Sequence, residues 1–278
     1  MKRLSYIIAI ITAVICSCSH VDEDERLIYV KPAQVSRCIL IEDFTGQRCV
    51  NCPVATAEIA KLQQHYGADT IIAVGIHSGP LGFAGNAKNL GLMTDMGNEY
   101  YNYWKVEYQP AGLINRNGGI LNYSDWQAKV YEELQKPAPL SLTIFTDYDP
   151  SSRNVNISII TLGTNGDTKG KLQLWLVEDG ITAMQLRYNT INNAASGQIT
   201  DHDYIHNHVF RDAVNGLWGD DFSIKEGEEK NQDFTCKLKD EWVANNMHVI
   251  AFVYNDEGVQ QVSIEKLYVH LETMNKTK

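Results

Sequence analysis

Two cysteines three residues apart lie between a predicted buried strand and a predicted helix, and this placement constrains the fold more than any other feature. Residues 38–44 form a near-continuous apolar run, which is typical of a strand buried on both faces. Residues 54–66 have the apolar spacing of a helix that stops at Gly67. The CxxC motif of Cys49 and Cys52 therefore opens a helix, where unpaired amides and the helix dipole stabilise a thiolate.

The two cysteines of this motif are expected to have different roles. Cys49 is expected to be the exposed attacking thiolate, with Arg48 as a neighbouring positive charge. Cys52, one helical turn further on, is expected to be the resolving thiol that closes the disulfide. Three interpretations remain open: redox activity, a structural disulfide on an inactive scaffold, and half of a zinc site, for which the chain has no second CxxC.

The elements around the motif predict the fold of the first half of the chain. After the first helix we expect a strand (70–76), a helix (92–104), a hairpin (111–114 with 119–121) and a helix that Ser124 caps and that ends at residue 134. This β-α-β-α-β-β-α order predicts a thioredoxin-like domain over residues 36–136.

The second half has a different pattern, and Pro137 and Pro139 mark the boundary. Short alternating or apolar runs separated by Asn, Asp and Gly turns predict strands at 141–147, 155–162, 172–178, 249–254 and 266–271. We therefore expect an antiparallel β-sandwich, of immunoglobulin-like type, over residues 137–278. The predicted fold class is α/β followed by all-β.

The first residues are typical of an export signal. Lys2 and Arg3 precede an uncharged run at 4–15, which is too short for a membrane span of about 20 residues. The segment Ile15-Cys16-Ser17-Cys18 resembles a bacterial lipobox. We predict a signal peptide over 1–17, lipidation of Cys18 that anchors the protein in a lipid bilayer, and an acidic tether over 18–35. Ordinary secretion, with Cys18 as a leftover thiol, is the alternative.

The charge excludes one class of partner. The chain of 278 residues has 24 basic and 34 acidic residues, a formal charge of −10. Removal of the signal peptide leaves 22 basic against 34 acidic residues, a charge of −12. A nucleic-acid partner is therefore not expected, because phosphate contacts need basic stripes. Six cysteines are too few for a disulfide scaffold.

Five other side chains are weaker candidates. Cys38 lies in the predicted first strand and could pair with Cys236, although an inert buried thiol is the simpler interpretation. His77 ends the second predicted strand, near the CxxC edge, where a structural role is favoured. His206 and His208 would share a face of an extended segment and could bind a divalent metal, although ordinary hydrogen-bonded histidines are the simpler interpretation.

The stretch 39–52 resembles thioredoxin. Asp43 stands six residues before Cys49, where thioredoxins carry a buried carboxylate, so the resemblance implies a proton relay between Asp43 and Cys52. Gln109-Pro110 is similar to the thioredoxin cis-proline loop, which implies a cis bond at Pro110 that faces the two sulfurs. The chain departs from thioredoxin before and between the cysteines, so the redox direction stays open.

A wider set of motifs resembles the outer-membrane-protein-28-related lipoproteins of Bacteroidetes. The motifs are 42–46, Cys49 with 51–53, 75–77, Pro110 with 115–116, 206–209, 218–219 and 251–255. The resemblance implies an outer-membrane lipoprotein that is exposed at the cell surface, and an adhesin or receptor role has been suggested for the family. No cofactor and no resident metal are expected.

Two functions follow from these observations. The first is thiol–disulfide exchange with a protein disulfide as substrate, carried by Cys49, Cys52, Asp43 and Pro110. The second is a non-catalytic binding protein of adhesin or receptor type, in which the β-sandwich holds a surface ligand and the CxxC is a structural disulfide.

Overall fold

The fold is given by a computed structural model that describes residues 33–191 and 194–268. These described residues belong to one compact unit. The predicted signal peptide, Cys18 and residues 18–32 of the tether lie outside the described residues. No helix within the described ranges is both long and apolar enough to cross a membrane.

The first half contains the elements that the sequence predicts, in the predicted order. They are β1 (Ile39–Thr45), α2 (Cys52–Tyr66), β2 (Ile71–His77), α3 (Asp95–Tyr103), β3 (Ala111–Ile114), β4 (Leu121–Asn122) and α4 (Trp126–Leu134). One detail is wrong. Asn122 rather than Ser124 supplies the cap, because its Oδ1 accepts the Ser124 amide and starts a 3₁₀ turn before α4.

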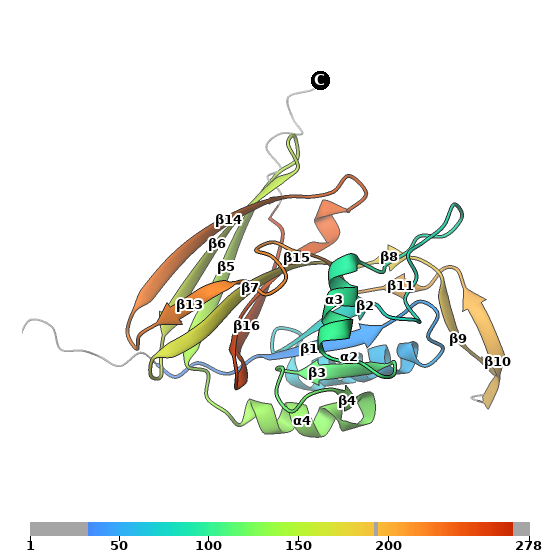
Figure 1. Cartoon of the computed structure of the whole chain (residues 1–278), viewed down its shortest axis with the longest axis horizontal. Helices are drawn as coiled ribbons and strands as arrows, with labels where there is room; N and C mark the ends of the chain where they lie inside the picture. The colour runs from blue at the N-terminus through green and yellow to red at the C-terminus, as the bar shows by residue number, and fades with distance from the viewer. Residues whose placement is uncertain (1–32, 192–193, 269–278) are drawn as a thin grey trace, which may run out of the picture. The chain divides into compact units, whose positions relative to one another are not determined.

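Strands β1 and β2 are buried on both faces, and alternate residues along them face different layers. Ile39 and Ile41 pack with α2 and α4, whereas Leu40 and Phe44 pack with α3 on the other face. This double burial explains the continuous apolar run that predicted β1. The helices α2 and α4 cover one face of the strand, and the apolar cluster that includes α3 covers the other (Figure 1).

The second half is almost entirely strands. They are β5 (Leu140–Asp149), β6 (Asn154–Gly163), β7 (Thr168–Glu178), β8 (Ile181–Thr182), β9 (Gln185–Ile191), β10 (Ala194–Asp201), β11 (Ile205–His206), β12 (Val209–Ala213), β13 (Asp220–Ile224), β14 (Glu229–Lys237), β15 (Met247–Asn255) and β16 (Gly258–Lys266). The predicted strand at 266–271 overlaps the last strand only at Lys266, because Gly258, at φ 100°, turns the chain directly after β15 and the partner strand ends at Lys266. Residues 269–271 of that prediction lie outside the described residues.

The largest sheet of the described chain crosses the predicted boundary at residue 136. Its order is β16-β15-β7-β12-β2-β1-β3-β4, and β13 also pairs with β7 (Figure 1). The two halves join through Val209 of β12, which pairs in parallel with Gly75 of β2. The division into two domains at this point stays a prediction, although one sheet runs through both.

A second sheet of three strands, β14-β6-β5, lies against the part of the large sheet that the second half supplies (Figure 1). Their facing side chains form one apolar cluster, with Ile157 and Ile159 from β6, Leu174 from β7 and Val249 from β15. The described chain is therefore a mixed α/β structure in which sheets dominate. This agrees with the coarse prediction of an α/β part followed by an all-β part.

Candidate functional site

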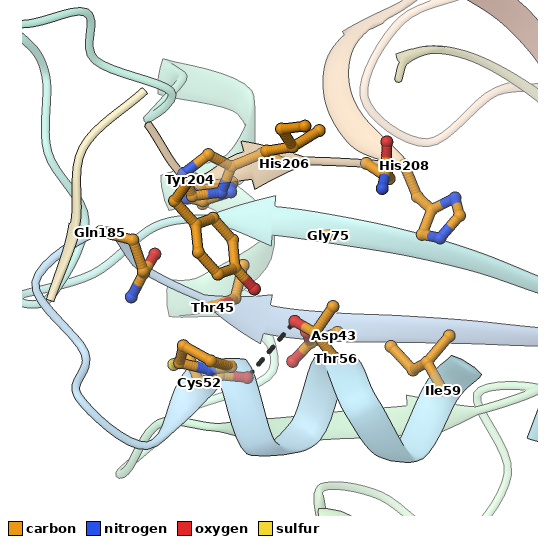
Figure 2. A pocket seen from close by; sticks show the side chains of 14 residues that line it. Asp43, Thr45, Cys52, Thr56, Ile59, Gly75, Gln185, Tyr204, His206 and His208 are labelled. Carbon is orange, nitrogen blue, oxygen red and sulfur yellow. Dashed lines mark hydrogen bonds between the residues drawn. The ribbon is translucent and has the colours of Figure 1, made fainter. Parts of the chain in front are cut away.

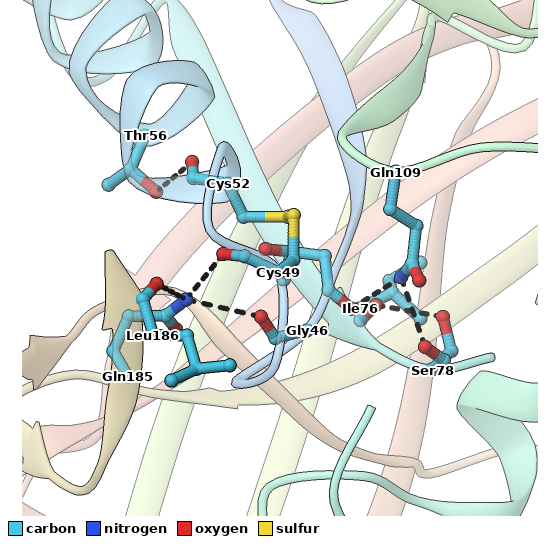
Figure 3. The surroundings of a disulfide bond; sticks show 10 residues. Gly46, Cys49, Cys52, Thr56, Ile76, Ser78, Gln109, Gln185 and Leu186 are labelled. Atoms are coloured by element: carbon cyan, nitrogen blue, oxygen red, sulfur yellow. Dashed lines mark hydrogen bonds between the residues drawn. A yellow bond between two sulfur atoms is a disulfide. The ribbon is translucent and has the colours of Figure 1, made fainter. Parts of the chain in front are cut away.

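Cys49 and Cys52 form a disulfide at the point where the chain leaves β1 and enters α2 (Figure 3). The loop between these elements is tight because Gly46 passes close to another segment. A Cβ on Gly46 would lie 2.2 Å from the Leu81 carbonyl oxygen, and the Arg48 amide donates to that same oxygen at 3.0 Å. Only glycine fits at position 46, so the loop holds the motif in one place.

The expectation that Cys49 is exposed is wrong. Cys49 and Cys52 are each 2% exposed. The start of β9 covers the loop, because the Leu186 amide donates to the Gln47 carbonyl at 2.8 Å, and the buried Gln185 side chain donates to the Cys49 carbonyl at 2.8 Å and the Gly46 carbonyl at 3.2 Å (Figure 3). A segment more than 130 residues away in the sequence therefore closes the disulfide from solvent.

The Gln47 side chain ties this cover to a third segment. Its Nε2 donates to the carbonyls of Leu90 at 3.0 Å and Met184 at 3.1 Å, and its Oε1 accepts the Leu92 amide at 2.8 Å. Gln47 is fully buried. Since buried amide groups are costly to leave unpaired, these bonds favour the closed arrangement over an open one.

Asp43 lines a small cavity beside Cys52, as the thioredoxin resemblance implied (Figure 2). The cavity has a volume of about 30 Å³, which is enough for a water molecule. Burial raises the pKa of Asp43 to about 8, so the carboxyl is protonated at neutral pH. Figure 2 shows the Tyr204 hydroxyl pointing toward Asp43 and Thr56, so β11 and the turn before it roof the cavity.

Three histidines, His77, His206 and His208, line the same cavity. The buried rings of His77 and His206 are 5.1 Å apart and tilted edge to face. Burial, followed by His206 and Arg211, lowers the pKa of His77 well below its ordinary value, and burial lowers the pKa of His206 to about 4. Both rings are therefore neutral at pH 7, which fits the structural role favoured for His77.

The predicted cis bond between Gln109 and Pro110 is present, and Pro110 is buried. Gln109 lies among the residues around the disulfide (Figure 3), where its Nε2 donates to the carbonyls of Thr45 at 2.7 Å and Ser78 at 3.0 Å. The structure thus brings Asp43 and Cys52 to one cavity and places Gln109, the neighbour of Pro110, among the residues around the disulfide. That Pro110 faces the two sulfurs stays a prediction.

The metal site suggested by His206 and His208 is not formed. His208 has φ 55°, which breaks the alternation of an extended segment. Its Nδ1 lies 3.4 Å from Asp179, whereas His206 packs against His77 and Tyr204. Within residues 33–191 and 194–268, no three His, Cys, Asp or Glu side chains converge on a point that could hold a metal.

Cys38 and Cys236 are half-buried free thiols that do not pair. They pack against different apolar clusters, Cys38 beside β1 and Cys236 on the three-stranded sheet. Burial, reinforced by Asp212, raises the pKa of Cys236 to about 11, and burial raises the pKa of Cys38. Both therefore remain protonated and unreactive at neutral pH.

Sequence reasoning missed the residues that close the site, namely Gln47, Gln185 and Tyr204. None of them belongs to a motif with chemical meaning. The only local signal is the polar, alternating stretch after residue 184, which is compatible with a hairpin but does not say what the hairpin covers.

Comparison with solved structures finds a likeness of fold. HBP35 of Porphyromonas gingivalis matches with a TM-score of 0.63 and 16% identity, over 85% of this chain and 77% of that one. A domain of the outer membrane lipoprotein Omp28 from the same organism is 23% identical over 48% of this chain and 90% of its own, with a TM-score of 0.33. No curated protein matches significantly.

Comparison with protein families places the chain more firmly. The model of the outer membrane protein Omp28 matches residues 97–270, which is more than half of the chain. The matched region begins in α3 and runs past β16 to residue 270, so it includes the cis-proline loop and the segment that covers the disulfide. The chain therefore belongs to the Omp28 family of outer membrane proteins, and the predicted outer-membrane location is confirmed with it.

Proposed function

We propose that the chain is a lipid-anchored outer-membrane lipoprotein that binds a ligand and does not turn over disulfides. In this proposal residues 36–136 are a thioredoxin-like scaffold, supported by the order of β1 to α4 and the cis bond at Pro110. Residues 137–278 carry an immunoglobulin-like sandwich, supported by the packing of the three-stranded sheet on the larger one. The disulfide stabilises the loop before α2.

The observation that carries the proposal is the burial of both sulfurs. Thiol–disulfide exchange requires a thiolate to reach a disulfide sulfur, so its rate depends on access. Cys49 and Cys52 are 2% exposed, and Gln185 and Leu186 hydrogen-bond to the loop that carries them. A substrate would have to occupy the place that β9 already fills.

The test is the reactivity of the disulfide in the native full chain, solubilised in detergent. We expect reduction by dithiothreitol, followed by maleimide labelling and mass spectrometry, to be at least 100-fold slower in buffer than in urea. We also expect no acceleration of insulin reduction above the rate with dithiothreitol alone. Turnover of insulin that Cys49→Ser abolishes would overturn the proposal.

Thiol–disulfide exchange after displacement of β9 is the second candidate, and the position of Asp43 favours it. A protonated carboxyl in the cavity that Cys52 lines can exchange a proton with the resolving thiol. The Cys49 thiolate would attack a substrate disulfide and release one substrate thiolate. The ionised fraction of Asp43, a minority at neutral pH, would take the Cys52 proton. Cys52 would then attack the Cys49 sulfur of the mixed disulfide and release the second substrate thiolate, and a small-molecule dithiol would restore the reduced pair.

This candidate makes a prediction that the first does not. Gln185→Ala should raise insulin reduction at least tenfold, and Asp43→Asn on that background should remove the gain. If Gln185→Ala speeds reduction of the protein's own disulfide but not of insulin, the exchange function fails and the closed-scaffold function stands.

The anchor is proposed at Cys18, which lies outside the described residues. The lipobox-like sequence and the outer-membrane family support it. In a bacterial host, Cys18→Ser should abolish incorporation of radiolabelled palmitate and move the protein from the membrane to the soluble fraction, whereas Cys16→Ser should not. Unchanged labelling of the Cys18→Ser variant would show that this residue is not the anchor.

A further inference from the structure

A second hollow, larger than the cavity beside the disulfide and open to solvent, lies where the end of α3 meets β7 and β15. It has a volume of about 780 Å³, within the range of about 300–1,000 Å³ usual for small-molecule sites. Aromatic rings line it, from Tyr103, Trp104, Trp218 and Tyr254. We call it the aromatic groove.

The rings of the aromatic groove are held in place before any ligand arrives. The Tyr254 hydroxyl donates to the Trp218 carbonyl at 2.7 Å, and the Tyr103 and Trp218 rings are 4.3 Å apart. Lys105, at φ 51°, ends α3 directly after Trp104. A Cβ on Gly219, at φ 69°, would lie 2.3 Å from the Leu172 carbonyl oxygen, so glycine is required beside Trp218.

A buried ion pair supports the groove, and its cation Arg116 is itself one of the lining residues, with an Nη1 that has no hydrogen-bond partner among the described residues. The Arg116 Nε donates to Glu42 at 2.6 Å, and its Nη2 donates to the other oxygen of that carboxylate at 3.1 Å. The Arg116 guanidinium lies 5.9 Å from the Trp104 ring and 4.6 Å from the Tyr254 ring. The cation thus stiffens the aromatic wall, and Glu42 cancels its charge toward the ligand.

The polar rim of the groove is balanced in charge. Lys171 donates to Asp221 at 2.7 Å, and Lys169 and Asp256 supply one further charge of each sign. A strongly anionic ligand would meet the two acids, and a cationic ligand would meet the two lysines. The rim therefore favours a neutral ligand that both accepts and donates hydrogen bonds.

The backbone at the floor of the groove has no open edge. Gly170 of β7 pairs with Phe222 of β13, and the adjacent Lys171 pairs with Tyr254 of β15. A peptide could not add to β7 here as an extra strand, which is how extended peptides commonly bind sheets. Recognition must come from the side chains, namely the aromatic faces and the polar rim.

We propose that the aromatic groove binds a neutral oligosaccharide. Pyranose rings have apolar C–H faces that stack on aromatic rings and hydroxyls around their edge, and the groove offers ring faces on one wall and mixed donors and acceptors on the rim. This proposal rests on the proposed binding function and names its ligand class. The exposed Tyr103 ring, 61% exposed, is the outermost stacking surface.

The test uses the full chain, solubilised in a detergent without a sugar headgroup. The probes are neutral gluco-, manno-, galacto- and N-acetylhexosamine oligosaccharides of two to six units, with uronic-acid oligomers as charged counterparts, and calorimetry is the readout. We expect at least one neutral series to bind, and Tyr103→Ala to weaken it at least tenfold. Tyr131→Ala, on α4 and equally exposed at 60%, is the matched control and should change the affinity less than twofold.

Several outcomes would overturn the proposal. They are no binding of any neutral probe at 10 mM, tighter binding of the uronic-acid series, or binding that Tyr103→Ala and Trp218→Phe leave unchanged. The result is separable from that of the proposed function. Cys49→Ser with Cys52→Ser should retain oligosaccharide binding, so insulin turnover by the native chain would refute the closed scaffold without touching the groove.

Discussion

The pocket beside the disulfide and the aromatic groove lie on opposite faces of the same strand. Asp43 and Glu42 are adjacent on β1, so their side chains point to opposite sides of the sheet. Asp43 faces the cavity under Tyr204, whereas Glu42 pairs with Arg116 behind the groove. The second half of the chain covers the cavity beside the disulfide, whereas it leaves the aromatic groove open to solvent.

The contrast shows that a motif and an accessible site are different things. The CxxC has the residues, spacing and helix terminus of a redox centre, but Gln185 and Leu186 occupy its solvent face. The aromatic groove has no motif, yet its Tyr103 ring reaches solvent. Function is therefore better argued from exposure than from motif alone in this molecule.

The largest effect is expected from breaking the ion pair between the two sites. Glu42→Ala leaves the Arg116 guanidinium buried and uncompensated, because both side chains are at most 2% exposed. We expect a loss of about 3–5 kcal/mol in the free energy of unfolding, measured with urea. Lys171→Ala removes an exposed pair with Asp221 and should cost less than about 1 kcal/mol. If both variants lost the same free energy of unfolding, burial of the ion pair would not determine how much it contributes to stability.

The second prediction concerns the protonation of Asp43, in the cavity beside the disulfide, and its effect on the free energy of unfolding. Its pKa is about 8 in the folded chain, raised by burial, against an ordinary value of 3.8. The folded state therefore holds a proton that the unfolded state has lost between these values, and stability falls as pH rises from about 4 through about 8. Asp43→Asn should abolish this fall, which is on the order of a few kcal/mol. Parallel stability curves for the two proteins from pH 4 to pH 9 would contradict it.

Removing the disulfide should cost less than breaking the ion pair. Cys49→Ser with Cys52→Ser opens a loop of only four residues, and loop-closure entropy then accounts for about 2 kcal/mol of unfolding free energy. Oligosaccharide binding at the aromatic groove should persist, because the groove is on the other face of β1. Loss of binding in a folded double mutant would show that the two faces are coupled.

The smallest change in stability is expected at Gln185, which covers the disulfide. Its specific effect is on the rate at which the disulfide is reduced. Gln185→Ala removes the bonds to the Gly46 and Cys49 carbonyls and should raise the rate of disulfide reduction by dithiothreitol about tenfold. The matched control is Gln198→Ala, an exposed glutamine on the neighbouring strand β10. If both variants are reduced at the wild-type rate, the cover does not limit access.

Much of the first half of the fold could be predicted because its signals are local. The apolar run of β1, the helical spacing of α2 and the turn residues between β3 and β4 act over a few residues each. In the second half, strands β9 to β14 were not predicted, because their alternation is mixed with polar residues and turns. The cis bond at Pro110 was implied by resemblance to a family and not by any local pattern.

The sequence by itself determined the buried strand, the CxxC at a helix start, the acidic residue beside it and the membership of an outer-membrane family. The tertiary structure alone decided that the cysteines are closed and the aromatic groove is open. The physical reason is sequence distance: Gln185 reaches Cys49 across 136 residues, and Tyr103 meets Trp218 across a similar gap. No local sequence pattern predicts which distant residues will meet, because these contacts depend on how β12 pairs with β2 and with β7.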